Sequence, residues 1–383
     1  MIDLPGLALV WAALPEARMV GGAVRDMLAG RAVADVDMAS PLAPEEVMRR
    51  ARAAGLKAVP TGLAHGTVTL VAAGHGFEVT TLRRDVETDG RRARVEFTDD
   101  WREDAARRDF TINAMSCTQA GEIFDYFGGQ ADLAAGVVRF VGDAAARVAE
   151  DYLRILRFFR FFARYGRREA DAAALAAIRD GREGLRQLSA ERVWSEVKKI
   201  LAAPAPLRAV ALMGETGVLE MVLPGARVER LAALLGRGAP SEPLLRVAAL
   251  SDEDLARRLK LSGAEAALLA AWRLPLGIGP EDEDAALRRA LAVAGHEALA
   301  GRIWLQGDDG AGWEALRARL SAMARPVFPL QGRDLAGVVE AGPKMGEVLA
   351  AVRGWWLEGG CVADRAACLA KASVFRDNFR SRI

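Results

Sequence analysis

Residues 20–38 read VGGAVRDMLAGRAVADVDM and join a glycine turn to two closely spaced aspartates. Gly21 and Gly22 carry no Cβ, so the backbone at this point can come close to a phosphate group and present its amides. Asp35 and Asp37 stand two positions apart, so on a strand their side chains face the same side. Carboxylates arranged in this way bind Mg²⁺ together with substrate phosphates. The stretch therefore predicts a site for nucleotidyl transfer, with Asp35 and Asp37 as catalytic metal ligands.

Arg25 follows the glycines and offers a planar set of donors for phosphate oxygens. Each fragment alone has a plainer explanation, because a Gly-Gly pair is usually just a turn and Asp-x-Asp is usually a surface loop. Together, the glycine pair, the spacer and the apolar-flanked aspartates resemble the signature of the polymerase-β-like nucleotidyltransferase superfamily. The combination favours the catalytic interpretation over the two plainer ones.

The composition is that of an enzyme with more than one domain. The chain has 383 residues, of which 51% are hydrophobic, more than one ordinary core requires. The formal net charge is only +1, so any nucleic-acid surface must be a local patch. Cys117, Cys361 and Cys368 lack metal-ligand spacing and favour a reducing compartment over a disulfide framework. With no signal-like start and no membrane-spanning stretch, the sequence predicts a cytoplasmic protein.

The pattern along the chain changes near residue 140. Before it, strand-like runs at 66–71 and 77–82 alternate with helix-like segments, which is typical of an α+β or α/β domain. After it, almost everything has helical character. A long amphipathic pattern covers 144–201, and Pro204 and Pro206 interrupt it before further helices begin. We expect a domain joint at these prolines.

Two features follow the first strand-like run. Glu78 lies between apolar neighbours, as a third catalytic carboxylate would, although a solvent-facing glutamate on an alternating strand is an equal alternative. Residues 83–98 are crowded with charges of both signs and nearly lack large apolar groups. They predict a mobile loop, either a flexible arm that remodels the site for each nucleotide or a solvated hairpin without a role.

Residues 107–115, RRDFTINAM, combine two guanidinium groups, a carboxylate and an amide that could hold ribose and phosphate. A charged helix start before a buried strand or helix would look similar. In residues 150–164, EDYLRILRFFRFFAR, arginines recur every three or four positions, so a helix would carry them on one basic face opposite an apolar one. Such a face suits a triphosphate or an RNA backbone, unless acidic neighbours compensate it.

Asp151 and Arg154 are three positions apart, so we expect them to project near each other from this helix. Together they offer acceptors and donors that could pair with the edges of bases, at about 1 to 3 kcal/mol of discrimination for each bidentate pair. An intrahelical ion pair is the alternative.

With these residues in place, the sequence resembles the class II tRNA nucleotidyltransferases, the family of CCA-adding enzymes and bacterial poly(A) polymerases. The resemblance covers residues 18–201 through motifs in the family's order and the later residues more loosely. The motifs are Gly21-Gly22-Ala23-Val24-Arg25-Asp26 with Asp35 and Asp37, His65-Gly66-Thr67-Val68, residues 107–115, Glu150-Asp151 with Arg154, and Glu191-Arg192 with Glu196 and Lys199.

The resemblance implies an α+β fold: an N-terminal polymerase-β-like nucleotidyltransferase head with a mixed sheet, followed by an all-helical neck, body and tail. The head would cover residues 1–139 and the neck, with its nucleotide-selecting helix, residues 140–203. The body, 204–320, and the tail, 321–383, would bind tRNA.

The resemblance also assigns roles by position. Asp35 and Asp37 would bind Mg²⁺, with Glu78 as a further catalytic carboxylate. The nucleotide-binding residues that it implies are Gly22, Arg25, Arg108, Asn113, Asp151, Arg154, Arg157 and Arg160. Within that set, Asp151 and Arg154 would select CTP and then ATP. Glu191, Arg192 and Glu196 would stabilise the neck helix instead of contacting substrate.

The activity implied is template-independent addition of CCA to the 3′ end of tRNA from CTP and ATP, with no membrane and no obligate protein partner. An A-adding specialist or a poly(A) polymerase of the same family is the alternative, and a small-molecule nucleotidyltransferase is a remote one. Residues 83–98 look complete, whereas CC-adding members have a shortened loop there. None of the three histidines is followed by aspartate, so we expect no His-Asp phosphohydrolase activity.

Overall fold

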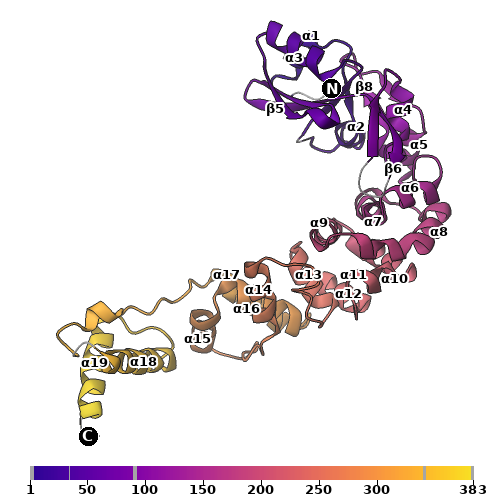
Figure 1. Ribbon diagram of the computed structural model, residues 1–383. Helices are drawn as coiled ribbons and strands as arrows, with labels where there is room; N and C mark the ends of the chain where they lie inside the picture. Colours follow the sequence, from indigo (N-terminus) through magenta and orange to yellow (C-terminus); the bar gives the residue numbers. More distant parts are fainter. Residues whose placement is uncertain (1–3, 34, 89–92, 340–341, 381–383) are drawn as a thin grey trace. The chain divides into compact units, whose positions relative to one another are not determined.

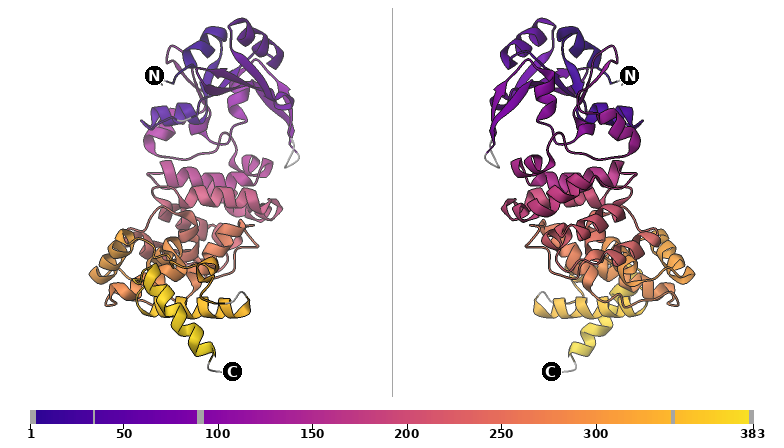
Figure 2. Two further views of the ribbon diagram at one scale, coloured as in Figure 1. Left: turned by 90° about the vertical axis from the view of Figure 1, so that its left-hand side faces the viewer. Right: turned by 90° about the vertical axis from the view of Figure 1, so that its right-hand side faces the viewer.

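The computed structural model describes residues 4–33, 35–88, 93–339 and 342–380 and separates into two compact units, residues 1–228 and residues 229–383. Within the described chain, every strand belongs to the first unit, and everything after the last strand is helical (Figures 1 and 2). The expected α+β head followed by helical segments is therefore confirmed.

The head contains a seven-stranded sheet in the order β3-β4-β5-β2-β1-β8-β9. Its strands are β1 Arg18–Val20, β2 Asp37–Ser40, β3 Lys57–Gly62, β4 Thr67–Ala72, β5 His75–Thr81, β8 Met115–Cys117 and β9 Ile123–Asp125. β2 and β5 pair in parallel, while the other neighbours pair antiparallel, so the sheet is mixed as expected. The parallel pair lies near the middle of the sheet.

One face of this sheet packs into the core of the head and the other is left open. Along β4, the apolar Val68, Leu70 and Ala72 are buried and alternate with half-buried residues, as a strand with one covered face requires. Helices α1 and α3 cover that face near β4. The helices of the head are α1 Leu7–Ala13, α2 Gly22–Leu28, α3 Pro44–Ala53, α4 Trp101–Ala106 and α5 Gly129–Ala135, with 3₁₀ turns η1 Leu63–His65 and η2 Thr111–Asn113.

Residues 83–98 are mostly a strand pair instead of a mobile loop, which agrees with the hairpin alternative. The antiparallel strands are β6 Arg83–Thr88 and β7 Ala93–Phe97, with a register shift between Asp85 and Glu87. Residues 89–92, at the turn, lie outside the described residues. The β-branched residues Val86 and Val95 favour the extended backbone although the stretch is polar.

The amphipathic region after residue 140 is a series of helices instead of one long one. They are α6 Ala144–Glu150, α7 Leu153–Tyr165, α8 Ala172–Gly181, η3 Arg182–Gln187, α9 Ala190–Leu201, α10 Pro206–Glu215 and α11 Val218–Val222. Asp143, Asp171 and Ser189 begin α6, α8 and α9 as caps, each accepting a hydrogen bond from a backbone amide of the first turn. Pro206 begins α10, where its missing N–H costs nothing.

Aromatic side chains hold α7 in place. Phe158 and Phe159 are fully buried, and the Phe158 ring stacks on Phe140 at 6.0 Å between centroids. Phe110 lies 4.8 Å from Phe140 and 5.2 Å from Phe161, so residues from the head join the same cluster. Each buried phenyl ring stabilises the fold by about 1.5 to 3 kcal/mol. The predicted apolar face of this helix is confirmed, and its burial fixes the direction of the arginines opposite.

The second unit is helical throughout its described residues. Its elements are α12 Val228–Gly236, α13 Pro243–Leu250, α14 Gly263–Arg273, α15 Asp284–Ala294, α16 His296–Gln306, α17 Ala311–Ala322, η4 Gly332–Leu335, α18 Pro343–Glu358 and α19 Arg365–Arg380. Gly301 on α16 lets α14 approach closely, because a Cβ there would lie 1.9 Å from Nε1 of Trp272. Its buried residues include one apolar cluster among α15, α16 and α17 and another around α18 and α19.

No helix in the described part of the chain is long and apolar enough to cross a membrane. Cys117 and Cys368 are buried free thiols, as expected for small apolar residues, whereas Cys361 is only half-buried.

Candidate active site

A cleft of about 860 Å³ lies within the first unit, between the glycine turn, the open face of the sheet, α7 and α9. Its lining includes nine arginines and one lysine but only four aspartates. The arginines are Arg25, Arg83, Arg107, Arg108, Arg154, Arg157, Arg160, Arg164 and Arg192. This excess of cations suits a polyanionic ligand such as a triphosphate or an RNA backbone.

The glycine turn lies at one side of the cleft. β1 ends just before Gly21, which has φ 64° and ψ −122°, a conformation open to glycine because it lacks Cβ. A Cβ on Gly21 would also lie 2.8 Å from Nη1 of Arg108. α2 then begins at Gly22, and its Arg25 points along the cleft. The predicted glycine turn is therefore present, and the missing Cβ of Gly21 leaves room for the guanidinium of Arg108.

The aspartates lie at the open face of the sheet. Asp37 begins β2, and Glu78 on β5 is its direct partner in the parallel register, so both side chains share a face. Asp35 precedes β2 and is exposed, so the expectation that both aspartates lie on one strand is wrong for Asp35. Asp37 lines the cleft, whereas Asp35 and Glu78 are not among its lining residues. Glu78 thus shares a face of the sheet with Asp37, as a further catalytic carboxylate must if it is to act with that predicted metal ligand.

The carboxylates of Asp37 and Glu78 have no cationic partner among the described residues that make ion pairs. Partial burial and then the negative charge of Glu78 raise the pKa of Asp37, against the attraction of Arg108. Within the described residues, no group of three or more His, Cys, Asp or Glu side chains is arranged to hold a metal ion. The acidic pair fits a hard divalent cation that takes its remaining ligands from substrate phosphates and water.

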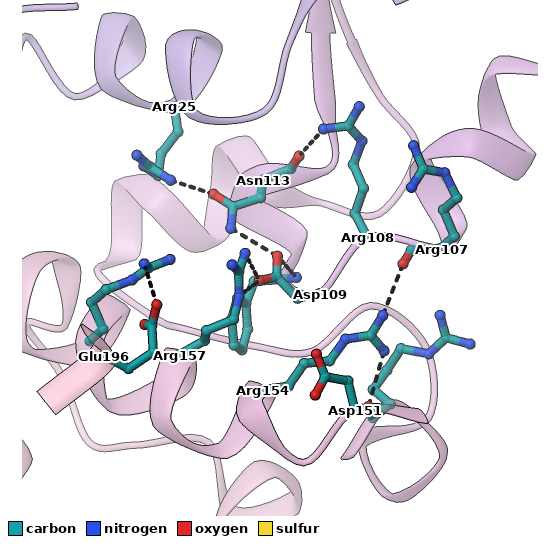
Figure 3. A network of polar contacts seen from close by, with 12 residues as sticks. Arg25, Arg107, Arg108, Asp109, Asn113, Asp151, Arg154, Arg157 and Glu196 are labelled. Carbon is teal, nitrogen blue, oxygen red and sulfur yellow. Dashed lines mark hydrogen bonds and ion pairs between the residues drawn. The ribbon is translucent and has the colours of Figure 1, made fainter. Parts of the chain in front are cut away.

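A chain of hydrogen bonds crosses the cleft from α2 to α7 (Figure 3). Nη1 of Arg25 donates to Oδ1 of Asn113 at 2.5 Å, and Nδ2 of Asn113 donates to Oδ1 of Asp109 at 2.9 Å. Nε of Arg157 donates to the other oxygen of Asp109 at 2.6 Å. Asp109 is only 7% exposed and therefore holds Asn113 from the head and Arg157 from α7 in one arrangement.

Arg108 approaches the same network from the end of α4. Its Nη2 contacts Asp104 at 3.1 Å, and its Nη1 donates to the carbonyl oxygen of Asn113 at 3.4 Å. Burial would raise the pKa of Asp104, but the charges of Arg108 and Arg107 outweigh it and lower that pKa. The structure thus brings together Arg25, Arg108 and Asn113, as predicted for a nucleotide site.

Three of the four arginines of α7 have acidic neighbours. Arg154 contacts Glu150, Arg157 contacts Asp109 at 2.5 Å, and Arg160 contacts Glu196 at 3.1 Å. Burial lowers the pKa of Arg160 in spite of Glu196. The basic face predicted from the sequence is present on α7. Carboxylates compensate part of its charge, as the alternative interpretation expected.

Asp151 corrects another expectation. It does not lie on the helix that carries Arg154, because α6 ends at Glu150 and α7 begins at Leu153. Its Oδ1 accepts a hydrogen bond from the Leu153 amide at 3.0 Å, and its Oδ2 contacts Arg192 at 2.9 Å. A short acidic side chain is favoured at such a position because it satisfies a free amide of the first turn. Asp151 and Arg154 both line the cleft but pair with different partners.

Some cleft residues were not identified as substrate-facing from the sequence. Arg192 and Lys199 on α9 line the cleft, although this helix was expected to have only a structural role. Glu196, between them, is 4% exposed and contacts Arg160 and Lys199. Arg192, Glu196 and Lys199 are spaced so that they lie on one side of a helix, and this spacing could have indicated that α9 faces the cleft.

Comparison with known families matches residues 17–139 to the poly A polymerase head domain and residues 171–229 to the "probable RNA and SrmB-binding site of polymerase A". The chain is 38% identical to "CCA tRNA nucleotidyltransferase 1, mitochondrial" of Danio rerio over 89% of this chain and 83% of the relative. It is 37% identical to the "CCA-adding enzyme" of Geobacillus stearothermophilus over 72% of this chain and 67% of the relative.

The fold has close counterparts among solved structures. The crystal structure of the Bacillus stearothermophilus CCA-adding enzyme in complex with CTP superposes with a TM-score of 0.74 at 28% identity, covering 98% of both chains. Because the matches extend over the head and the helical segments alike, the chain belongs to the family of CCA tRNA nucleotidyltransferases and poly(A) polymerases and is an RNA nucleotidyltransferase.

Proposed function

We propose that this chain adds CCA to the 3′ end of tRNA, using CTP and ATP and releasing pyrophosphate. The observation that carries the proposal is the match to a CCA tRNA nucleotidyltransferase over nine-tenths of the chain, together with a cleft in which Asp37, the register partner of Glu78, lies among nine arginines. The cation excess of the cleft fits a nucleoside triphosphate and an RNA end at once.

Divalent metal use is general in this family, and we propose Mg²⁺ held by Asp35 and Asp37, with Glu78 beside them. When bound, the ion would lower the cost of forming charge at the RNA 3′-hydroxyl and at the leaving pyrophosphate. Asp37 and Glu78 suit this role because they are in-register neighbours without an arginine partner in the described chain. Carboxylate oxygens are also the ligands that Mg²⁺ prefers.

The chain's own residues bind and orient the nucleotide. The backbone at Gly22 and the guanidinium of Arg25 contact the triphosphate, and Arg157 and Arg160 contact it from α7. Asn113 is held by Asp109 and Arg25, so its amide is fixed before the nucleotide arrives. Such preorganisation lowers the cost of ordering the site on binding.

Base selection is proposed for Asp151 and Arg154, with Arg108 and Asn113 at the sugar and phosphates. Arg192 fixes one oxygen of Asp151, and Glu150 fixes Arg154, so neither side chain turns freely. The remaining donors and acceptors of this pair can meet the edge of a base. Full discrimination would combine such contacts at about 1 to 3 kcal/mol each.

The four-part organisation also stays a proposal: head 1–139, neck 140–203, body 204–320 and tail 321–383. The mixed sheet of the head and the helices of the remaining parts agree with it. The cytoplasmic location stays a prediction, since a relative named above is mitochondrial.

The test uses purified protein, Mg²⁺ and three tRNA transcripts that end before CCA, after C and after CC. Each receives CTP, ATP or both, and products are resolved at single-nucleotide length. We expect the first transcript to grow by two residues with CTP alone and by three with both nucleotides. Extension of only the CC-ended transcript by one A would instead identify an A-adding specialist, long A ladders a poly(A) polymerase, and no extension of any RNA a small-molecule enzyme.

A further inference from the structure

A second cavity of about 630 Å³ lies in the first unit where α7 ends, next to the ends of α2 and α5. Leu28, Leu133 and Ala163 contribute apolar surface to it. Arg31 and Arg164 line it together with Arg167, and we call it the Arg31 pocket. No carboxylate is among its lining residues, so it differs from the first cleft in having cations alone.

The fold fixes two of these arginines. Nη2 of Arg31 donates to the carbonyl oxygen of Arg164 at 2.8 Å, and the Arg31 guanidinium lies 4.6 Å from the centre of the Tyr165 ring. Nη2 of Arg167 donates to the carbonyl oxygen of Ala134 at 2.5 Å, at the end of α5. Gly136 makes room for it, since a Cβ there would lie 2.6 Å from Cβ of Arg167.

These carbonyl contacts explain where the arginines point but not why three cations gather. Capping the end of a helix needs one cationic side chain near its last carbonyls. Within the described residues, neither Arg31, Arg164 nor Arg167 makes an ion pair. Asp26 is near Arg164, but Arg25 and the Tyr165 hydroxyl already engage it. Three uncompensated guanidinium groups around a cavity therefore indicate an anionic ligand.

We propose that the Arg31 pocket binds backbone phosphates of the RNA substrate just upstream of the 3′-terminal nucleotide. This inference rests on the proposed function, because it needs an RNA whose 3′ end lies in the first cleft. Arg164 lines both cavities, so the Arg31 pocket adjoins the first cleft and lies where the upstream phosphates of the same strand would follow. The apolar surface of the pocket suits sugars and base faces.

A phosphodiester fits this pocket better than free pyrophosphate does. Arg31 donates to one carbonyl oxygen through Nη2, and Arg167 donates through Nη2 to the carbonyl oxygens of Leu133 and Ala134, so both side chains keep their Nε and Nη1 donors for phosphate oxygens. Pyrophosphate leaves such reactions with a divalent cation, and the pocket has no carboxylate in its lining to receive one.

The experiment measures binding of a fluorescent tRNA transcript ending in CC to the full-length protein by anisotropy, without nucleotides and over a range of salt concentrations. The test variant is Arg31→Gln with Arg167→Gln, two residues outside the lining of the first cleft. Arg52→Gln, an exposed arginine on α3, is the matched control. We expect binding of the test variant to weaken roughly tenfold and the slope of log affinity against log salt to fall by about 0.7 to 0.9 for each lost contact.

A second measurement separates this role from a loss of folding or of chemistry. At saturating tRNA, the KM for ATP and the thermal unfolding midpoint of the test variant should stay near those of the wild type, and Arg31→Lys with Arg167→Lys should recover most of the salt slope. If wild type extends tRNA but the test variant binds it with unchanged affinity and slope, this inference alone is wrong. The same holds if only inhibition by inorganic pyrophosphate changes. If wild type neither binds nor extends tRNA, the proposed function fails.

Discussion

On the sheet side of the cleft, Asp37 and Glu78 lie next to each other with no arginine paired to either in the described chain, whereas on the helix side Arg157 and Arg160 each contact a carboxylate. The charges of these two arginines are therefore compensated before any ligand binds. On the sheet side, burial and then the negative charge of Glu78 raise the pKa of Asp37. Groups that carry such a cost in the folded state are candidates for binding a cation from outside the chain.

Asp37→Asn tests the uncompensated side and should have the largest effect. Losing a metal ligand removes several kcal/mol of transition-state stabilisation, so nucleotide transfer should fall by about a thousandfold or more. Because the change also removes the repulsion with Glu78, the thermal unfolding midpoint should stay the same or rise slightly. Single-turnover extension of a CC-ended tRNA and a thermal melt measure the two effects.

Asp180→Asn, an exposed aspartate on α8, is the control for this variant and should change neither quantity. Retained binding of tRNA by Asp37→Asn would show that the site is formed. If transfer and folding are lost together, Asp37 has a structural role and the comparison between the two sides is wrong.

Asp109→Asn tests the compensated side. It leaves Arg157 without its charged partner and disturbs Asn113, which Asp109 holds at 2.9 Å. Because the Arg157 side chain is 34% exposed, we expect a loss of about 2 to 3 kcal/mol in the free energy of unfolding, below the full cost of breaking a buried pair. Chemical denaturation measures it, and KM for both nucleotides should rise together.

Arg157→Gln supplies the rest of a double-mutant cycle. If Asp109 acts through Arg157, the double variant should be less destabilised than the sum of the two single variants. Additive losses would mean that Asp109 stabilises Asn113 alone.

The two sides of the cleft differ in how much of their structure can be predicted from the sequence. The apolar side of α7 follows from periodicity, so the arginine face was predictable, whereas the mixed sheet of the head was implied only by the family resemblance. The neighbour relation of Asp37 and Glu78 depends on the register between β2 and β5, and the contact of Asp109 with Arg157 joins residues 48 positions apart. Neither relation has a local signal.

Two errors have a different origin, because local signals were present. The spacing of Asp151 and Arg154 predicts that both lie on one helix, although a short acidic residue is also favoured just before a helix begins. The charge of residues 83–98 predicts a mobile loop, whereas their β-branched residues favour the hairpin alternative, which the strands β6 and β7 form. Polarity alone does not separate an exposed strand pair from a loop.

Asp104→Asn tests a further compensated carboxylate through the pH dependence of the free energy of unfolding. Asp104 is 3% exposed and contacts Arg107 at 2.8 Å and Arg108 at 3.1 Å. Since its folded-state pKa is lowered, it contributes stability at pH values above its unfolded pKa and loses that contribution as the pH falls through the folded pKa. We expect the variant to be about 1 to 2 kcal/mol less stable at pH 7 and the difference to shrink below about pH 4. Urea titrations at pH 7, 4 and 3 measure it, and a constant difference would contradict the assignment.

Tyr165→Phe should have the smallest effect and addresses how the compensated side is held in place. The Tyr165 hydroxyl donates to Asp26, which in turn contacts Arg25 at 2.9 Å, while the Tyr165 ring lies 4.7 Å from the Arg25 guanidinium. The variant keeps the ring and removes one hydrogen bond worth about 1 kcal/mol, so KM for CTP and ATP should rise about fivefold with little change in kcat. Tyr126→Phe, on a half-buried ring of the head, is the control. An equal rise in the control, or a change in the preference between CTP and ATP, would mean that Tyr165 does not act by orienting Arg25 toward the triphosphate.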